Sequence, residues 1–433
     1  MVEAPALAFI MAFFLKFHRV GHGLPEEYVF RQNDNIPQYL FIAVIVALFL
    51  GLTVSAEEII RDRKILAREK FLDLSWMSYL LSKVGILFLI SAIQTGLFVL
   101  VGHAVLGIQG QHLQHWLLLF SASCFANVLG LNVSASFNSA KVIYIMIPVL
   151  IIPQLLFSGI IVKFDKLHPW FASQRSVPVV GNVMASRWAY EGLAVTQFMD
   201  NRYEREFYAL DQRMKNANWK KDLWVRELES AVSNVRRALN GFPEGVELEH
   251  DLGLLRTELA KEARMIKGFS FQRIAELEPD KVNAEVLDEL TAALNVLTQH
   301  YRNVFKAAEA EKEQRIARMT ADPERRAQYF ALINGHRNES LADVVTNKNE
   351  VNVIVTDAGE LIQKSDPIYL EPTYSGFFGA QFYAPAKWLG GIRVPTLAAN
   401  TLVLWAMSLL LAMTLYFELF PRLLKKFGGR AVG

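Results

Sequence analysis

Cysteine is almost absent from this sequence. The single one, Cys124, lies inside an apolar run, so no disulfide can form within the chain. We interpret Cys124 as a small packing residue. The sequence therefore offers no disulfide framework, and the fold has to be held together by packing and hydrogen bonds.

Catalytic and metal-binding motifs are missing as well. The sequence has no His-Glu-x-x-His, no Gly-x-Ser-x-Gly and no Cys/His cluster with metal-ligand spacing. It also lacks a Gly-rich loop that ends in Gly-Lys-Ser/Thr, which an ATPase needs to hold phosphates, and a Leu-Ser-Gly-Gly-Gln segment. We predict no catalytic residue, no metal site, no cofactor in this chain and no ATP hydrolysis by it alone. The nine histidines are scattered, and we interpret His112 and His115 as surface residues.

An excess of one charge is lacking too. The 45 basic and 43 acidic residues give a formal net charge of +2, and the two signs are interleaved along the chain. Nucleic-acid binding usually leaves a basic stripe on one face or helix. We therefore predict no nucleic-acid partner.

Hydrophobic residues are abundant, at 52% of the chain, but they are unevenly distributed. Residues 1–162 and 394–417 are largely apolar, whereas 196–350 is rich in charged, helix-favouring residues. This contrast predicts a membrane part and an aqueous part joined in one chain, with lipid as the first partner.

Six apolar runs are predicted to cross the membrane. The first, 4–17, is shorter than the roughly 20 residues that a spanning helix needs, so we expect upstream residues to complete it. Pro148 and Pro153 interrupt the fifth run and predict a kinked helix. The remaining runs are 39–56, 84–106, 116–137, 142–162 and 395–417.

The basic residues predict the orientation of these spans. The stretch 57–83, Lys141 and the basic tail all fall on one side of six crossings, which the positive-inside rule makes cytoplasmic. We therefore predict an all-α membrane protein of the inner membrane with six transmembrane helices and a large helical external domain between spans five and six. Its predicted parts are 1–162 (spans one to five), 163–393 (the external or periplasmic region, with a helical domain at about 196–365) and 394–433 (span six and a cytoplasmic tail).

Acidic and basic residues alternate between spans two and three. Apolar side chains recur there at helical spacing, which predicts an amphipathic helix on the cytoplasmic surface at about 57–70. The alternative is an ordinary loop whose charges only fix the topology. The charged residues of this helix are Glu57, Glu58, Arg61, Asp62, Arg63, Lys64, Arg68, Glu69 and Lys70.

Polar and small residues repeat along one face of the fourth span. Such a face is unfavourable against lipid, so it either lines a cavity or packs closely against another helix through hydrogen bonds. Both alternatives stay open. The residues are Ser123, Asn127, Gly130, Ser134 and Asn138.

Two further segments follow the fourth span. In 155–162, LLFSGIIV, Ile160 and Ile161 are by composition ordinary lipid-facing or core aliphatics. In 186–192, SRWAYEG, Arg187 and Glu191 stand at i and i+4, where an ion pair can form, and Trp188 is typical of a membrane interface. An ordinary interfacial helix would explain the second segment equally well.

Taken in order, these segments resemble the permease domain of ABCG-type (white and pleiotropic-drug-resistance class) ABC exporters. The resemblance rests on Glu57, the pair Arg68 and Glu69, then Ser78, Tyr79 and Lys83, on Phe-Ser-Gly at 157–159, and on Arg-Trp-Ala-Tyr-Glu at 187–191. It implies that the helix at 57–70 receives ATPase motion, and that Ile160 and Ile161 form a constriction on a path that Ser123, Asn127, Ser134 and Asn138 line. It places Arg187, Trp188, Tyr190 and Glu191 in an external re-entrant segment.

The resemblance also implies partners. ATP and Mg would belong to an ATP-binding cassette domain, fused upstream or separate, and two permease units would form a homodimer or heterodimer. The implied function is export of a lipidic or hydrophobic substrate.

The charged region has apolar stripes of its own, which predict an autonomous helical domain and a periplasmic partner. A membrane-anchored periplasmic scaffold is the alternative function. A short strand is predicted at 351–356, and the aromatic segment 377–388 is typical of a membrane-interface belt. The stripes are Leu228, Val232, Val235 and Leu239, and Val282, Val286, Leu290, Leu294, Leu297, Tyr301 and Val304.

Overall fold

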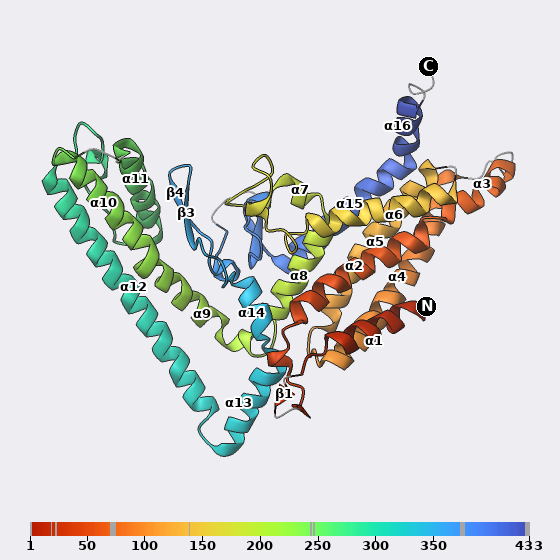
Figure 1. The fold of residues 1–433 in the computed structure, drawn as a ribbon, viewed down its shortest axis with the longest axis horizontal. Coiled ribbons are helices and arrows are strands. Elements are labelled where there is room, and N and C mark those ends of the chain that lie inside the picture. The colour runs from red at the N-terminus through yellow and green to blue at the C-terminus, as the bar shows by residue number, and fades with distance from the viewer. Residues whose placement is uncertain are drawn as a thin grey trace. The chain divides into compact units, whose positions relative to one another are not determined.

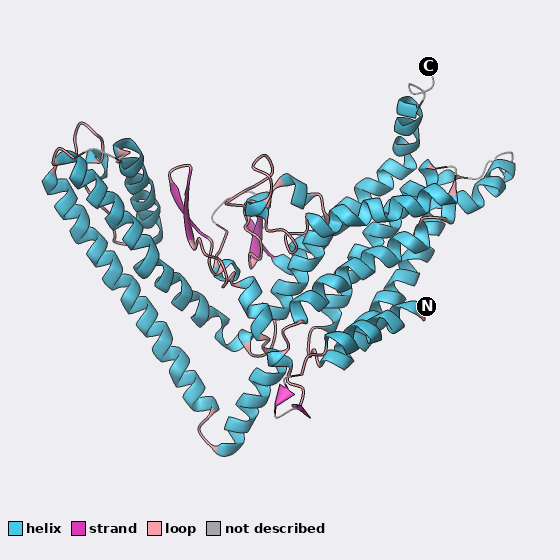
Figure 2. Ribbon diagram, in the orientation of Figure 1, coloured by secondary structure: helices cyan, strands magenta, loops and turns pink. Residues whose placement is uncertain are grey.

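The computed structural model describes residues 2–18, 20–21, 24–69, 75–137, 139–242, 245, 247–372 and 377–428. The chain is mostly α-helical, with 72% of it in helices, as Figure 2 shows. Within the described residues, three two-stranded antiparallel hairpins accompany the helices. The prediction of a mostly helical protein is confirmed, and the hairpins add short strands to it.

The chain divides into two compact units, each described here by itself. Unit 1 comprises Met1–Glu204, Phe330–Val345 and Glu371–Gly433, and unit 2 comprises Arg205–Tyr329 and Thr346–Leu370. Each unit is therefore assembled from segments that are distant in the sequence.

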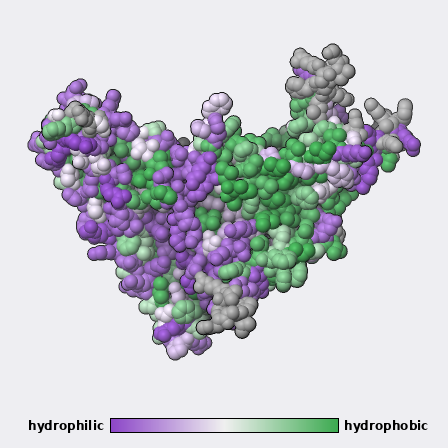
Figure 3. Space-filling view, in the orientation of Figure 1, coloured by the Kyte–Doolittle hydropathy of each residue, from purple (hydrophilic) through white to green (hydrophobic). Residues whose placement is uncertain are grey.

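Unit 1 contains the apolar helices, several of which run side by side (Figure 1). On the face shown in Figure 3, hydrophilic residues dominate the surface of unit 2, whereas apolar residues gather over the helices of unit 1. Its elements are α1 (Glu3–Leu15), β1 (Val20–Gly21), β2 (Leu24–Pro25), α2 (Ile36–Ser55), α3 (Glu58–Glu69), α4 (Trp76–Leu106), α5 (His112–Ser136), α6 (Ala140–Leu156), α7 (Val179–Asn182), α8 (Ala185–Met199), α14 (Glu339–Val345), β5 (Ala386–Leu389), β6 (Ile392–Pro395), α15 (Thr396–Tyr416) and α16 (Leu419–Gly428).

Four helical stretches of the described residues are long and apolar enough to cross a membrane. They are Ile36–Arg63, which contains α2, Trp76–Leu106, His112–Ser136 and Thr396–Tyr416. Helices α1 and α6 are apolar but have only 13 and 17 residues. The predicted count of six spans is therefore not confirmed and stays a prediction.

Helix α6 ends earlier than predicted, at Leu156 rather than Val162. The Phe-Ser-Gly segment forms the turn that follows it. Gly159 has φ +84°, and a Cβ at this position would overlap the ring of Phe164. Glycine is therefore required there both by the backbone conformation and by the close approach of the ring.

Helix α5 is the centre of unit 1, since α2, α4, α8 and α15 all pack against it. Small residues permit the closest approach. A Cβ on Gly51 of α2 would lie 2.6 Å from the carbonyl oxygen of Ser123, and a Cβ on Gly130 would overlap Ser55 Oγ. A shift of α5 would therefore be felt by every helix that surrounds it.

Helix α14 lies far along the sequence from the rest of unit 1 but is fixed to the loop before α2. Asn338 Nδ2 donates to the carbonyl oxygens of Phe30 and Asn33 at 2.9 and 2.8 Å. Ser340 Oγ donates to Asp34 O at 3.1 Å. The returning chain is thus anchored on unit 1 by side-chain to backbone hydrogen bonds.

The aromatic segment 377–388, predicted as an interface belt, leads into a hairpin. Strand β5 pairs with β6 in antiparallel register, with Trp388 opposite Arg393. Trp388 Nε1 donates to Pro372 O at 3.0 Å. The hairpin ends at Pro395, and α15 begins at the next residue, so it positions the start of the last apolar helix.

Unit 2 consists of long polar helices and one hairpin. The two strands pair in antiparallel register, with Ile354 opposite Gln363, so the strand predicted at 351–356 begins three residues later than expected. Its elements are α9 (Glu204–Trp219), a π-helical turn (Lys220–Trp224), α10 (Val225–Leu239), α11 (Leu248–Met265), α12 (Ala284–Met319), α13 (Pro323–His336, whose second half lies in unit 1), β3 (Ile354–Asp357) and β4 (Glu360–Gln363).

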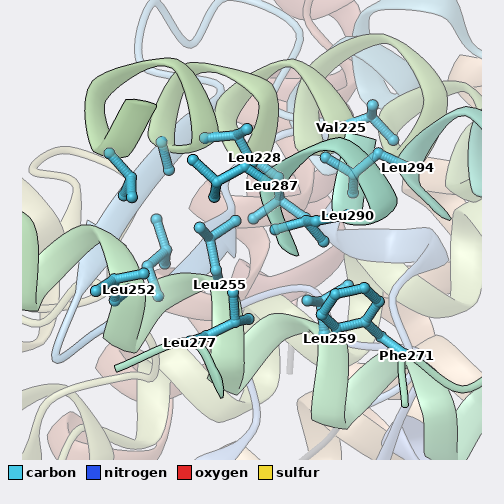
Figure 4. Packing of buried hydrophobic residues seen from close by; sticks show 14 of the residues in the cluster. Val225, Leu228, Leu252, Leu255, Leu259, Phe271, Leu277, Leu287, Leu290 and Leu294 are labelled. Atoms are coloured by element: carbon cyan, nitrogen blue, oxygen red, sulfur yellow. The ribbon is translucent and has the colours of Figure 1, made fainter. Parts of the chain in front are cut away.

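Unit 2 has a hydrophobic core of its own between α10, α11 and α12 (Figure 4). The predicted stripes supply much of it, because Leu228, Val232 and Val235 are buried, as are Val282, Val286, Leu290, Leu294 and Leu297. Leu239 is 41% exposed, so the first stripe ends one turn earlier than predicted. The two predicted apolar stripes are therefore confirmed for the residues that are buried in this core.

We expect Leu290→Asp to unfold unit 2. Leu290 is fully buried, and an uncompensated carboxylate in its place should cost about 3–5 kcal/mol. Hydrogen exchange of the full chain should then show loss of protection throughout α10–α12. Val296→Asp, on the same helix but 63% exposed, is the matched control and should leave protection unchanged. Equal protection in both variants would show that the core does not depend on this seam.

Candidate functional site

The predicted amphipathic helix at 57–70 is present as α3, and its N-terminus is held by the end of α5. The backbone N–H groups of Ile59 and Ile60 both donate to Ser134 Oγ at 3.0 Å. A helix leaves its first N–H groups without intrahelical partners, and here another helix supplies the acceptor. Arg63 Nη2 donates to the carbonyl oxygens of Ala135 and Phe137, both at 3.1 Å.

The other side of α3 is fixed to the start of α4 through one lysine. Lys83 Nζ lies 2.7 Å from Glu58 Oε2 and 2.6 Å from Asp62 Oδ2. Tyr79 Oη donates to Asp62 Oδ2 at 3.2 Å. All four side chains are less than half exposed, so screening weakens these contacts less than it would on an open surface.

Among the described residues, Glu57, Arg61 and Arg68 make no ion pair with α4 or α5. Arg61 pairs with Glu58 within the helix, and Arg68 is exposed. Glu57 faces the hydroxyl of Tyr144 on α6. The side chains of Lys64 and Glu69 lie outside the described residues, as does Lys70.

Part of this site was not predicted. Glu58 was named only as one charged residue of the helix and Lys83 only as part of a motif, and the joining of Glu58 and Asp62 by Lys83 was not foreseen. The available signal was the i, i+4 spacing of Glu58 and Asp62, which places both carboxylates on one face of α3.

Ser134 was assigned to a translocation path, but its Oγ accepts the two N–H groups of α3. Ser123 Oγ donates to Ser91 Oγ at 2.9 Å, and Asn127 Nδ2 donates to the same oxygen at 2.7 Å. These bonds join α5 to α4 and favour the packing alternative for Ser123 and Asn127. Asn138 lies outside the described residues.

Ile160 and Ile161 follow the turn at Gly159. Ile160 is half-buried, and Ile161 is 56% exposed. Their role as a constriction stays a prediction.

Arg187 and Glu191 are the centre of a buried charge cluster in α8. Arg187 Nη1 lies 3.5 Å from Glu191 Oε2, and Lys387 Nζ of β5 lies 2.8 Å from the same oxygen. Asn400 Nδ2 of α15 donates to it at 2.9 Å, while the N–H of Tyr383 donates to Oε1 at 3.1 Å. Glu191 thereby joins α8, the hairpin and the last apolar helix.

This charge cluster holds two cations for one anion, and the side chains of Arg187, Glu191 and Lys387 are at most 1% exposed. Burial lowers the pKa of Lys387 to about 8. Burial alone would raise the pKa of Glu191, but the nearby charges of Arg187 and Lys387 outweigh it and hold that pKa below its ordinary value. The carboxylate of Glu191 therefore balances the positive charges of both Arg187 and Lys387.

Aromatic side chains enclose the charge cluster. The Arg187 guanidinium lies 3.8 Å from the ring centroid of Trp188, within the range of a cation–π interaction. Trp188 and Tyr190 are fully buried, so Trp188 packs inside the protein, and its position at a membrane interface stays a prediction. Lys387, Asn400 and Tyr383 were not predicted. A lysine and an asparagine beside apolar runs were the signal that could have marked the first two.

Helix α3 and all of α8 except Met199 lie within residues 6–198. Residues 6–198 match the ABC-2 type transporter family. The match supports an ABC permease and a multi-pass membrane protein. No curated protein and no solved structure matches the chain.

The ABC-2 match contains the contacts of α3 with α4 and α5, and it contains Arg187 and Glu191 of the charge cluster, whereas Lys387, Asn400 and Tyr383 lie outside it. Permeases of this family generally pair with ATP-binding cassette partners and form dimers. Among the residues that the structure describes, no group of three or more His, Cys, Asp or Glu side chains is arranged to hold a metal ion.

We expect Ser134→Ala to loosen α3. The change removes the acceptor of two N–H groups, and an unsatisfied buried donor costs about 1–3 kcal/mol. Hydrogen–deuterium exchange of residues 58–63 should accelerate. Ser136→Ala is the matched control, because Ser136 Oγ donates to Asn132 O at 2.6 Å within α5 itself. Unchanged exchange in Ser134→Ala would mean that α3 is held by its other contacts.

Proposed function

We propose that the chain is the permease of an ABCG-like ABC exporter, with α3 as the helix through which ATPase motion enters. The observation that supports this proposal is the double attachment of α3. Lys83 fixes it to α4, and Ser134 accepts its N-terminal N–H groups at the end of α5. A push on α3 would act on both helices together.

The contacts suggest how such a push would travel. Helix α5 packs against α2, α4, α8 and α15, so its displacement would reach α8 and the Glu191 charge cluster. Packed helices transmit strain because protein interiors are close-packed. In this proposal the charge cluster keeps α8 and α15 together while the bundle changes shape.

The finer features of the proposal come from the family resemblance. The protein would form a homodimer or heterodimer in the inner membrane, with six spans per copy and with ATP and Mg on a fused or separate cassette domain. Ile160 and Ile161 would narrow the path of a lipidic or hydrophobic substrate. Unit 2 would lie in the periplasm and receive cargo or contact a periplasmic partner.

Purification from native membranes tests the proposal. The full chain, solubilised with its surrounding lipid, should retain an ATP-binding cassette protein or domain and show ATP hydrolysis that vanadate inhibits. Loss of the cassette partner on deletion of residues 58–69, with the rest of the chain still in the membrane, would support α3 as its contact. Purification with periplasmic proteins but no ATPase would favour the scaffold alternative.

A further inference from the structure

Three histidines form a chain at the turn between α4 and α5. His103 lies in the last turn of α4, and His112 and His115 lie in the first turn of α5. His103 Nδ1 is 2.8 Å from His112 Nδ1, and His103 Nε2 is 3.1 Å from His115 Nδ1. The three rings are thus joined through both nitrogens of the central one.

The chain of rings leads from the surface into the bundle. His112 is exposed, whereas His103 and His115 are 2% and 1% exposed. The interpretation of His115 as a surface residue is therefore wrong. Its Nε2 is buried and has no hydrogen-bond partner in the part of the chain that the structure describes.

This arrangement differs from a metal site. His103 turns one nitrogen toward His112 and the opposite nitrogen toward His115, so the two contacts lie on different sides of its ring. Ligands of one ion would converge on a single point. What the rings share instead is a continuous row of nitrogen atoms, and each contact between them needs exactly one proton.

Protonation of the outer ring fixes the direction of the whole row. A neutral imidazole has one donor and one acceptor, so the neutral chain can be arranged in either direction. A protonated His112 has two donors, and its Nδ1–H must donate to His103 Nδ1. His103 then carries its proton on Nε2 and donates to His115 Nδ1, which leaves the proton of His115 on Nε2.

We propose that these three histidines are a hydrogen-bond relay, in which protonation of exposed His112 selects the tautomer of buried His115. The proton binds at Nε2 of His112, which is free to accept it only when every contact in the row is donated from His112 toward His115. In the reverse arrangement that nitrogen already carries a proton, so acid pH depopulates this arrangement; the two arrangements interconvert by loss of the Nε2 proton of His112 to water and gain of one from water at Nε2 of His115. The relay goes beyond the proposed transport function and does not depend on it. It would make the interior of the bundle responsive to the pH at that turn.

The neighbouring elements contribute few charges to this site. The charged groups that act on His103 are His112 and His115, with no carboxylate among the described residues. Tyr39 of α2 is adjacent, since a Cβ on Gly102 would overlap its hydroxyl. Helix α15 contains no Asp, Glu, Lys, Arg or His.

Other titratable groups lie on the loops nearby and on α8 and α13. Tyr28 Oη donates to Leu106 O at 2.7 Å, and Lys16 Nζ, just after α1, lies 4.6 Å from the Tyr28 ring centroid. The charged residues of α8 belong to the cluster around Glu191, and His336 of α13 follows Gly335, which approaches Gln109. None of these groups interrupts the row of nitrogens.

Nitrogen spectroscopy of the full chain tests the relay. The protein, labelled with ¹⁵N-histidine and held in lipid nanodiscs, is titrated from alkaline to acid pH. The His115 Nε2 resonance should shift to the protonated position in step with the titration of His112. In His112→Ala this shift should be lost, while His300→Ala, an exposed histidine of unit 2, should leave it unchanged.

A second variant separates a relay from simple electrostatics. His103→Phe keeps a ring in the middle position but removes its nitrogens, so His112 should still titrate and His115 should no longer follow. If the substitution of buried His103 prevents folding, the test rests on His112→Ala, which changes an exposed residue. A His115 resonance that is constant while His112 titrates, or that still shifts in His112→Ala, would overturn the proposal.

Discussion

Glu191→Gln should destabilise unit 1 by about 3–5 kcal/mol, the cost of leaving a buried charge without its partner. The substitution removes the only anion that contacts Arg187 and Lys387 within the described residues, while both cations stay buried. Lys387 can release its proton, because burial already lowers its pKa to about 8. Arg187 has no such escape, since a guanidinium does not deprotonate in proteins. Thermal unfolding in detergent should show the loss.

Two variants calibrate this expectation. Lys387→Met leaves Arg187 and Glu191 as a balanced pair, so it should be milder than Glu191→Gln. Glu371→Gln breaks a pair with Arg393 in which both side chains are about 45% exposed, and should cost about 0–1 kcal/mol. If Glu191→Gln proved as mild as Glu371→Gln, the buried charge cluster would not hold α8 in place.

In the proposed transporter, Lys83→Met should uncouple the bundle from the partner ATPase by about tenfold or more, since coupling free energies between sites are about 1–3 kcal/mol. The change leaves Glu58 and Asp62 adjacent without the cation that joins both to α4. Two like charges one helical turn apart also repel each other. Helix α3 should then move without carrying α4 with it.

Because the chain has a single cysteine, thiol labelling can measure this coupling without knowledge of the transported substrate. Cys124 is buried, so Ile161→Cys introduces one accessible thiol near the end of α6. In the proposed complex with an ATPase, the rate of maleimide labelling should depend on nucleotide, and Lys83→Met should remove that dependence while ATP hydrolysis continues. Lys141→Met, an exposed lysine at the start of α6, is the matched control. Undiminished dependence in Lys83→Met, at normal expression, would contradict this role.

Helices that depend on a local pattern of apolar and charged residues could be predicted from the sequence. Long apolar runs predicted α2, α4, α5 and α15, and the spacing of Ile59 and its neighbours predicted α3. The limits of α6 were missed because hydropathy continues through 157–162, whereas Gly159 and the ring of Phe164 require a turn there. The hydropathy of a segment does not show that its backbone has to turn at one residue.

Contacts between distant segments could not be predicted in the same way. Lys387 and Glu191 are 196 residues apart, and Asn400 is 209 residues from Glu191. No periodicity relates such positions, so their meeting depends on how α8 and α15 pack. The histidine row is different, because its three members lie within 13 residues around one turn, counted from His103 to His115. The spacing of the three histidines did not reveal that His115 is buried.

The anchoring of α14 has a consequence for biosynthesis. The carbonyl groups of Phe30 and Asn33 receive their bonds from a residue 308 and 305 positions later in the chain. At about 5–20 residues per second, the ribosome supplies Asn338 roughly 15–60 s after this loop has been made. During that interval the first segment of unit 2, Arg205–Tyr329, is synthesised, so the carbonyl groups of the loop before α2 receive these hydrogen bonds only after most of another unit has been made.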